Sequence, residues 1–352
     1  MEKIKSTQYY SIDIAKIIMA VLVVAIHRPP FEKETFLFYF GGTIVGGLAV
    51  PFFFIASSFL LFSKIKENPG KSNEYVKKNL LRLIKLYVIW SVINLPCAFV
   101  RRFTGHYDEI TVKLFIGEVV AYIKDFFLDS SFMQLWFLNT LIVSIFIVHL
   151  LSKKFSAKTI LIISLLLCAV YKTFFLFPSQ FPVMNSIINK IPALVSNVLN
   201  KGFVCVALGI YTANTKIINK KVSIILLSFS LIFFFGFSYY NYFYLKNELL
   251  MNIILTIFLF FIPYLIIQLC LNITLNYSPI YIYLRKISIL IYFTHFLLMA
   301  EAFSYIAFLT GFEIFNQNWF RFIFDLCFAF GLSNLILFLS NKKAFRWLKN
   351  LY

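Results

Sequence analysis

The chain of 352 residues is too apolar to be a water-soluble domain. Hydrophobic residues make up 61% of it, aromatic residues 20% and charged residues only 14%, and the mean hydropathy is +0.83. A soluble domain of this size has to expose much more polar surface to water, whereas a disordered chain contains few hydrophobic residues. These values exclude both classes and indicate an all-α, polytopic membrane protein.

The apolar stretches predict about ten transmembrane helices, since each crossing needs about 20 residues. In chain order the predicted spans are 10–28, 41–63, 79–100, 131–151, 158–176, 191–213, 221–244, 249–272, 286–310 and 318–341. The segments between them are short, so we expect a single integral membrane domain over 1–352. The longest is an outer loop at 101–130. Apolar residues at helical spacing predict an amphipathic helix within it, either on the outer membrane surface or as a solvent-edge helix without function.

The positive charge is distributed as in a membrane protein. The net charge is +18. With a cytoplasmic N-terminus, the inner segments hold about twice as many Lys and Arg residues as the outer ones, which predicts that both termini are cytoplasmic. We therefore expect the protein to be surrounded by membrane lipid and to bind no nucleic acid. The Ile-, Phe-, Lys- and Asn-rich composition favours a bacterial plasma membrane. The five cysteines stand singly, so no metal site is expected.

The first predicted span carries three ionisable residues on one helix face. Lys16 and His27 are eleven residues apart, which is close to three helical turns, and the helical rise separates them by about 16 Å. Asp13 is near the same stripe and is expected to pair with Lys16 at i, i+3. Ionisable side chains are costly in lipid and are functional candidates. The alternative is that Lys16 snorkels to the cytoplasmic interface and that His27 is an ordinary residue at the end of the helix.

Later spans add further polar candidates. Arg82 and Lys85 share a face near the inner end of the third span, where they either bind phosphate or anchor the helix. His295 lies well inside the ninth span, with Glu301 further out. In the second span Ser57 and Ser58 are placed to form hydrogen bonds across helices or to their own backbone.

The tenth span contains a pair of opposite charges. Arg321 and Asp325 are at i, i+4, and we expect them to form a structural ion pair.

Four segments, taken in order, resemble the acyltransferase-3 family of integral membrane acyltransferases. Lys16-x10-His27, with Asp13 before it, is similar to the family's Arg/Lys-x10-His signature. The other three segments are Val50-Pro51-x-Phe53-Phe54-x-x-Ser57-Ser58-Phe59, Leu135-Trp136-Phe137-Leu138 and Ser288-x-x-Ile291-Tyr292-x-x-His295. Together with the ten spans the likeness covers the whole chain. The segments around His27 and Pro51 also resemble the membrane half of membrane-bound serine racemases.

The sequence departs from the family pattern at three positions. Ser58 stands where the family usually has Gly. In the third span, Asn79 and Lys85 stand where the family tends to have a basic residue and a Pro on either side of Arg82.

The resemblance implies a membrane O-acyltransferase. It would move an acyl group, most often acetyl, from cytoplasmic acyl-CoA to a hydroxyl of an extracytoplasmic or lipid-linked acceptor such as a cell-surface or wall polysaccharide. Acyl-CoA is then a co-substrate, no cofactor is bound permanently, and an oligomer is possible. The resemblance makes His27 the catalytic residue. The donor-binding candidates are Lys16, Arg82, Lys85 and Lys78, and the supporting or cavity residues are Asp13, Ser57, Ser58, Trp136, Tyr292, His295 and Glu301.

Two other classes remain open at this point. Ten spans with buried charges also suit a transporter of a small polar substrate or an amino acid. A purely structural assembly partner would need neither Lys16 nor His27.

Overall fold

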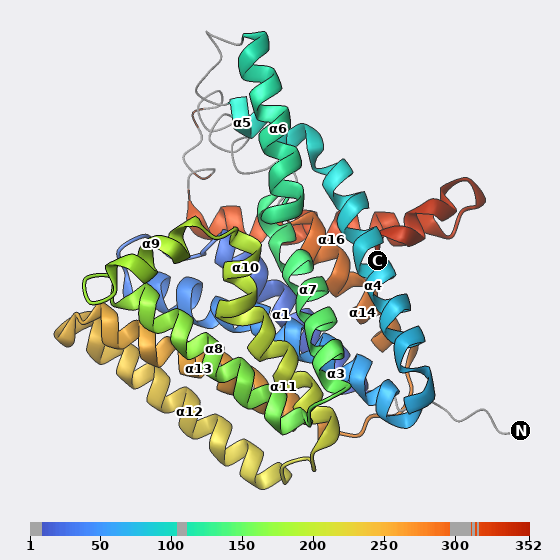
Figure 1. The fold of residues 1–352 in the computed structure, drawn as a ribbon. Helices are drawn as coiled ribbons and strands as arrows, with labels where there is room; N and C mark the ends of the chain where they lie inside the picture. Colours follow the sequence, from blue (N-terminus) through green and yellow to red (C-terminus); the bar gives the residue numbers. More distant parts are fainter. Residues whose placement is uncertain (1–8, 104–110, 296–310, 312–313, 315–316) are drawn as a thin grey trace, which may run out of the picture. The chain divides into compact units, whose positions relative to one another are not determined.

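The structure is a computed structural model that describes residues 9–103, 111–295, 311, 314 and 317–352 (Figure 1). Helices are the regular secondary structure of the described part of the chain, which contains no β-strand. Helices suit a lipid environment because they satisfy their backbone hydrogen bonds internally, where an unpaired polar group would cost several kcal/mol. The predicted all-α class is confirmed.

The chain divides into two compact units. The first consists of residues 1–72 and 205–346, and the second of residues 73–204 and 347–352. The α-helices of the first unit are α1 (Tyr10–His27), α2 (Phe36–Phe38), α3 (Ala49–Glu67), α11 (Phe203–Asn214), α12 (Lys220–Tyr240), α13 (Glu248–Leu271), α14 (Pro279–Thr294) and α16 (Asn318–Ser340). A π-helical turn at Tyr39–Val45 and a 3-10 turn at Gly46–Leu48 lead into α3.

The second unit is built from seven α-helices in its described part. They are α4 (Ser72–Ile93), α5 (Leu95–Phe103), α6 (Val112–Leu128), α7 (Trp136–Ser152), α8 (Ala157–Leu176), α9 (Pro182–Lys190) and α10 (Ala193–Asn197). The helix predicted within the outer loop is α6, and Arg102 on α5 forms ion pairs with Glu118 and Asp125 on it. The C-terminal residues pack on α4, where the indole nitrogen of Trp90 donates to the carbonyl of Leu351 over 3.1 Å.

Short polar residues set several helix starts. The side chain of Asn247 accepts from Leu250 N at the start of α13, and Ser278 caps α14 ahead of a proline at its first position. Ser156 caps α8 in the same way. Each cap satisfies backbone N–H groups that the first helical turn leaves unpaired.

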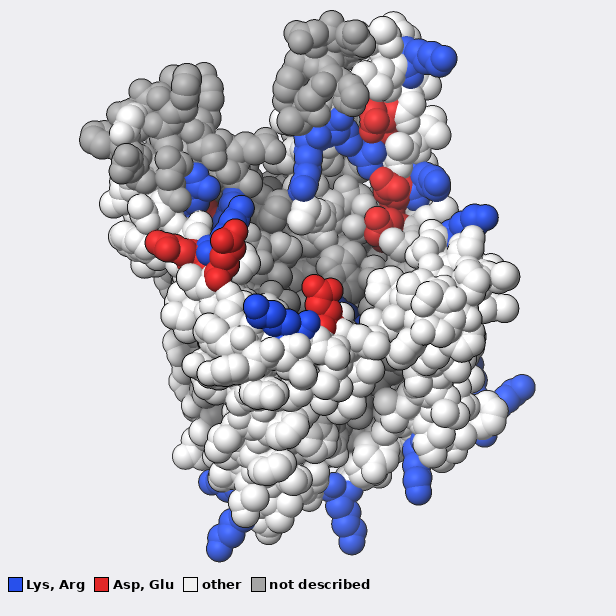
Figure 2. All heavy atoms as spheres, turned by 90° about the vertical axis from the view of Figure 1, so that its left-hand side faces the viewer, with Lys and Arg blue, Asp and Glu red and all other residues white. Residues whose placement is uncertain are grey.

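The outward surface of the first unit is apolar where it would be polar in a soluble protein. Ile225, Phe229 and Ile232 project from one side of α12 and are all exposed. The lysines of this helix, Lys220 and Lys221, stand at its start. Figure 2 shows a broad band of surface without Lys, Arg, Asp or Glu on the face drawn there. Such a surface is stable against lipid and not against water.

Most of the predicted spans correspond to helices of the structure, with differences in number and bounds; residues 112–152, which include the helix of the predicted outer loop, form a single long apolar segment. Eight helical segments of the described residues are long and apolar enough to cross a membrane. The third predicted span is a pair of helices, Pro69–Ile93 and Leu95–Phe103, that meet at 52°. The ninth begins earlier than predicted, because α14 starts at Pro279 and not at 286. The remainder of that span, including Glu301, lies outside the described residues.

Candidate active site

Two helices of the first unit, α1 and α14, form the framework of the site. They pack along each other, and with α16 they enclose a core of Ala20, Val24, Ile287, Ile291 and Ala329. Polar side chains meet on either side of this core. Asp13 contacts Arg285 near the start of each helix, and His27 contacts His295 near the end of each. The two helices therefore run in the same direction, as a first and a ninth span of an alternating series should.

Two histidine rings face each other at one end of this framework. The ring centroids of His27 and His295 are 5.2 Å apart. The ring of Tyr292, one turn before His295, lies 6.2 Å from it, and Phe53 on α3 packs edge-on against Tyr292 at 6.3 Å. The geometry thus brings together His27, His295 and Tyr292, which the sequence analysis had placed in one site.

The tautomer of His295 is fixed by its surroundings. Its side chain is buried, with 5% of its surface exposed, and Nδ1 lies 3.1 Å from the carbonyl oxygen of Ile291. A carbonyl only accepts hydrogen bonds, so Nδ1 carries the hydrogen. In the neutral ring Nε2 then holds the lone pair, and it can accept a proton or a hydrogen bond.

A charged pair lies next to the histidines. Arg28 follows His27 directly, and its Nε donates to Oδ2 of Asp325 over 2.9 Å. Asp325 is 2% exposed, and its Oδ1 accepts no hydrogen bond from any residue that the structure describes. Arg28 is a partner of Asp325 that the i, i+4 spacing of Arg321 and Asp325 does not predict, because α1 brings this cation from far away in the sequence.

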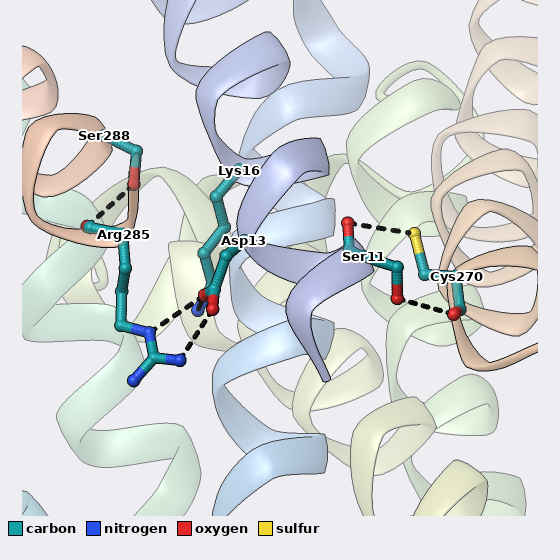
Figure 3. A network of polar contacts seen from close by, with 6 residues as sticks. All are labelled: Ser11, Asp13, Lys16, Cys270, Arg285 and Ser288. Atoms are coloured by element: carbon teal, nitrogen blue, oxygen red, sulfur yellow. Dashed lines mark hydrogen bonds and ion pairs between the residues drawn. The ribbon is translucent and has the colours of Figure 1, made fainter. Parts of the chain in front are cut away.

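The other end of the framework holds a second charged cluster (Figure 3). Asp13 accepts two hydrogen bonds from the guanidinium of Arg285, at 3.0 and 2.6 Å. Lys16 Nζ lies 3.5 Å from the same carboxylate, as the i, i+3 spacing predicted. Ser288 Oγ donates to the carbonyl of Arg285 and secures the turn that carries it. On the other side of α1, Ser11 Oγ donates to the carbonyl of Cys270 over 2.6 Å.

The two serines of α3 have different surroundings. Ser58 is fully buried, and its hydroxyl donates to the carbonyl of Val206 on α11 over 2.7 Å. Its hydroxyl therefore joins two helices, one of the two roles that the sequence analysis allowed. At this contact the residue without a side chain is Gly209, which lies on α11 and faces Ser58. Ser57 is half-buried.

The remaining candidates belong to the second unit. Lys78, Arg82 and Lys85 are all exposed on α4, and Lys85 Nζ donates to Oδ1 of Asn350 over 2.8 Å. The indole ring of Trp136 lies under the ammonium group of Lys201, at 6.0 Å.

Sequence reasoning missed two arginines of the site. Arg28 is the last residue of the predicted first span and Arg285 lies one residue before the predicted ninth, so both stood at span ends and neither was a candidate. In both cases the sequence contained a clue, namely a carboxylate inside another span, Asp13 for Arg285 and Asp325 for Arg28. A buried acid needs a cation nearby. Within the described ranges, no three His, Cys, Asp or Glu side chains are gathered so that they could hold a metal ion.

Comparison with known proteins gives a family and two partial relatives. Two proteins named "Amino-acid racemase" from Enterococcus faecalis are 31% and 28% identical over 169 and 149 residues. These matches cover 46% and 42% of this chain but only 21% and 20% of the relatives, so the chain spans about a fifth of their length. No solved structure matches. The family model for acyltransferase-3 proteins, described as an acyltransferase domain, matches residues 9–338 and therefore runs through both units. The chain therefore belongs to the acyltransferase-3 family.

Proposed function

We propose that the protein moves an acyl group, most often acetyl, from acyl-CoA to a hydroxyl of an extracytoplasmic or lipid-linked acceptor, such as a cell-surface or wall polysaccharide. The supporting observation is the α1–α14 framework, with paired histidines at one end and cations around a buried acid at the other. Lys16 and His27 are about 16 Å apart along the helix, which is about the length of a phosphopantetheine arm. A donor whose phosphates are at Lys16 therefore reaches His27 with its thioester.

His27 is the general base of the proposed reaction. Neutral His27 takes the proton of the acceptor hydroxyl while the hydroxyl oxygen attacks the carbonyl carbon of the thioester. The carbon–sulfur bond then breaks, and the protonated imidazole returns the proton to the thiolate of CoA. In the variant with a covalent relay, the imidazole nitrogen attacks the thioester carbon first, the carbon–sulfur bond breaks, and CoA leaves as the thiol with the imidazole proton. The acceptor hydroxyl then attacks the acyl-histidine, takes the acyl group and returns its proton to the imidazole.

His295 and Tyr292 support this step. Nδ1–H of His295 is held by the Ile291 carbonyl, so its Nε2 is the nitrogen that can accept a hydrogen bond from the His27 ring or from the acceptor. Arg28 and Asp325 lie at the same end and offer a donor and an acceptor of hydrogen bonds to the acceptor's hydroxyl groups.

The basic residues of α4 are proposed as further donor contacts. Arg82, Lys85 and Lys78 are exposed cations that suit the phosphates of CoA, and the guanidinium of Arg82 can bind phosphate through two parallel hydrogen bonds. We also retain in this proposal the supporting roles that the family resemblance implies for Ser57, Ser58, Trp136 and Glu301. The excess of Lys and Arg in alternate segments supports a plasma membrane orientation with cytoplasmic termini and a cytoplasmic donor.

A transporter of an amino acid or another small polar substrate is the competing function. The carboxylates of Asp13 and Asp325 are buried in spans, and such residues often mark substrate pathways. The two relatives are named amino-acid racemases, which makes an amino acid the substrate to test.

The test uses the purified protein in sealed vesicles with acetyl-CoA on one side and a bacterial surface-glycan extract on the other. The acyltransferase predicts release of free CoA together with acetyl transfer to the glycan. Amino-acid flux across the same vesicles without acetyl-CoA, and no release of CoA with it, would overturn the proposal in favour of transport.

A further inference from the structure

The buried acid at the Lys16 end is bound by Arg285, which lies three residues before the Ser288–His295 segment. Asp13 is 2% exposed, and Arg285 alone supplies a hydrogen bond to each of its carboxylate oxygens, at 3.0 and 2.6 Å. Lys16 is a second cation on the same carboxylate, at 3.5 Å. Two cations around one acid leave an excess of positive charge in the cluster formed by Asp13, Lys16 and Arg285 (Figure 3). Such an excess attracts an anion.

Arg285 is held in a position that suits anion binding. Its Nε and Nη2 form the pair with Asp13, and Nη1 is not part of that pair. The side chain is 40% exposed, although the acid that it binds is buried. A guanidinium fixed along one edge can offer its other edge to a second planar or tetrahedral anion, because its five N–H groups have a rigid geometry. Asp13 therefore orients Arg285 and does not use up all its donors.

Aromatic rings lie one helical turn from this cluster. Tyr281 precedes Arg285 by one turn on α14, and it stacks on Tyr10 of α1 with 5.0 Å between the ring centroids. Tyr277 lies 6.1 Å from Tyr10 and is 64% exposed. Cations for phosphate beside aromatic faces for a base are the groups that bind a nucleotide. A lipid headgroup would use the cations but would leave the rings without a planar partner.

We infer that Arg285, oriented by Asp13 beside Lys16, binds a phosphate of the acyl-CoA nucleotide, with the Tyr10–Tyr277–Tyr281 rings next to the base. The inference rests on the proposed function, since it assumes that acyl-CoA is the donor. It adds a residue to the donor site and assigns the nucleotide end of the donor to the starts of α1 and α14.

The test varies the donor as well as the protein. The KM is measured for acetyl-CoA, for acetyl-4′-phosphopantetheine and for acetyl-pantetheine, which lacks phosphate. Arg285→Gln is expected to raise the KM for acetyl-CoA by about tenfold to a hundredfold, the usual effect of losing a charge-assisted hydrogen bond. Its KM for acetyl-pantetheine should stay within about twofold of the wild-type value. Lys220→Gln, which removes an exposed cation at the start of α12, is the matched control and should leave the ratio between the donors unchanged.

A second variant separates binding from structure. If Arg285 only neutralises Asp13, the double variant Asp13→Asn with Arg285→Gln should recover the wild-type KM for acetyl-CoA. The inference predicts that the double variant keeps the high KM. A loss that is equal for all three donors, or that occurs only in vesicles containing anionic lipid, would overturn it.

The two proposals fail in different ways. A wild-type protein that turns over acetyl-CoA, with donor ratios that Arg285→Gln does not alter, would overturn only the role of Arg285. A wild-type protein that neither binds labelled CoA nor releases it from acetyl-CoA would overturn the proposed function and this inference together.

Discussion

The contact between α3 and α11 leaves no room for a side chain at position 209. A Cβ added to Gly209 would overlap the Cβ of Ser58 and would lie 2.6 Å from Ser58 Oγ and 2.8 Å from the backbone carbonyl oxygen of Ile55. The hydroxyl of Ser58 can rotate away, but its Cβ and the carbonyl of Ile55 are fixed by the backbone of a buried helix. We therefore predict that Gly209→Ala forces the two helices apart and destabilises the protein.

The size of the effect follows from three contributions. Overpacking of a tight contact costs about 1–3 kcal/mol. Separation of the helices also weakens the hydrogen bond from Ser58 to Val206, which is worth about 1 kcal/mol. Replacement of glycine within a helix returns about 1 kcal/mol. The net loss is about 1–3 kcal/mol, or a decrease in Tm of about 1–4 °C for a chain of 352 residues.

The assay is thermal unfolding in detergent with a matched glycine as control. Gly236 lies in α12, and an added Cβ there meets no atom within 4 Å. Gly236→Ala should therefore keep or slightly raise the Tm. Equal Tm values for the two alanine variants would refute the close approach of α3 and α11.

Three further predictions concern polar side chains in the first unit. Asp325→Ala removes the partner of Arg28 and should cost about 1.5–3 kcal/mol of stability in the same thermal assay, and Asp325→Asn should cost less because its amide oxygen still accepts from the guanidinium. Ser58→Ala should cost about 1 kcal/mol, again read as a Tm shift, and a Tm equal to that of the wild type would argue against its hydrogen bond to Val206. His295→Ala should lower kcat by about a hundredfold with little change in KM, and a pure KM effect in initial-rate measurements would contradict its place beside His27.

The helical positions of the ionisable residues could be predicted because they depend on local geometry. The i, i+3 pair of Asp13 and Lys16 follows from 100° per residue, and the structure places it as predicted. The eleven-residue spacing of Lys16 and His27 likewise puts both residues on one side of α1. That side contacts α14, because Asp13, the partner of Lys16, binds Arg285, and His27 lies against His295.

The partners across helices could not be predicted from local geometry. The sequence offered Arg321 as the cation near Asp325, but it could not show that the packing of α1 against α16 also brings Arg28 to this carboxylate. Arg285 was placed outside the membrane because the apolar stretch that follows it sets the predicted boundary at 286, whereas the capped helix starts seven residues before that boundary, at Pro279. A hydropathy value measures the cost of burying an isolated charge. It contains no information on a neighbouring acid that offsets this cost.

The bend in the third span has a similar origin. A window of apolar residues predicts one crossing for 79–100, but the chain forms two helices that meet at 52° around Asn94. Pro96 follows at the second position of α5, where it lacks an N–H and cannot continue the hydrogen bonding of α4. The sequence shows that a proline is present, but it does not show in which direction the chain bends.

The most direct test of the account compares two histidine variants in acetyl-CoA turnover. His27→Gln removes the proposed base, and His149→Gln is the control, since His149 lies on α7 and contacts Asn73 over 2.9 Å. The account predicts that His27→Gln loses about two to four orders of magnitude in kcat at an unchanged Tm, while His149→Gln keeps its turnover. A His27→Gln protein with wild-type turnover would contradict the central claim.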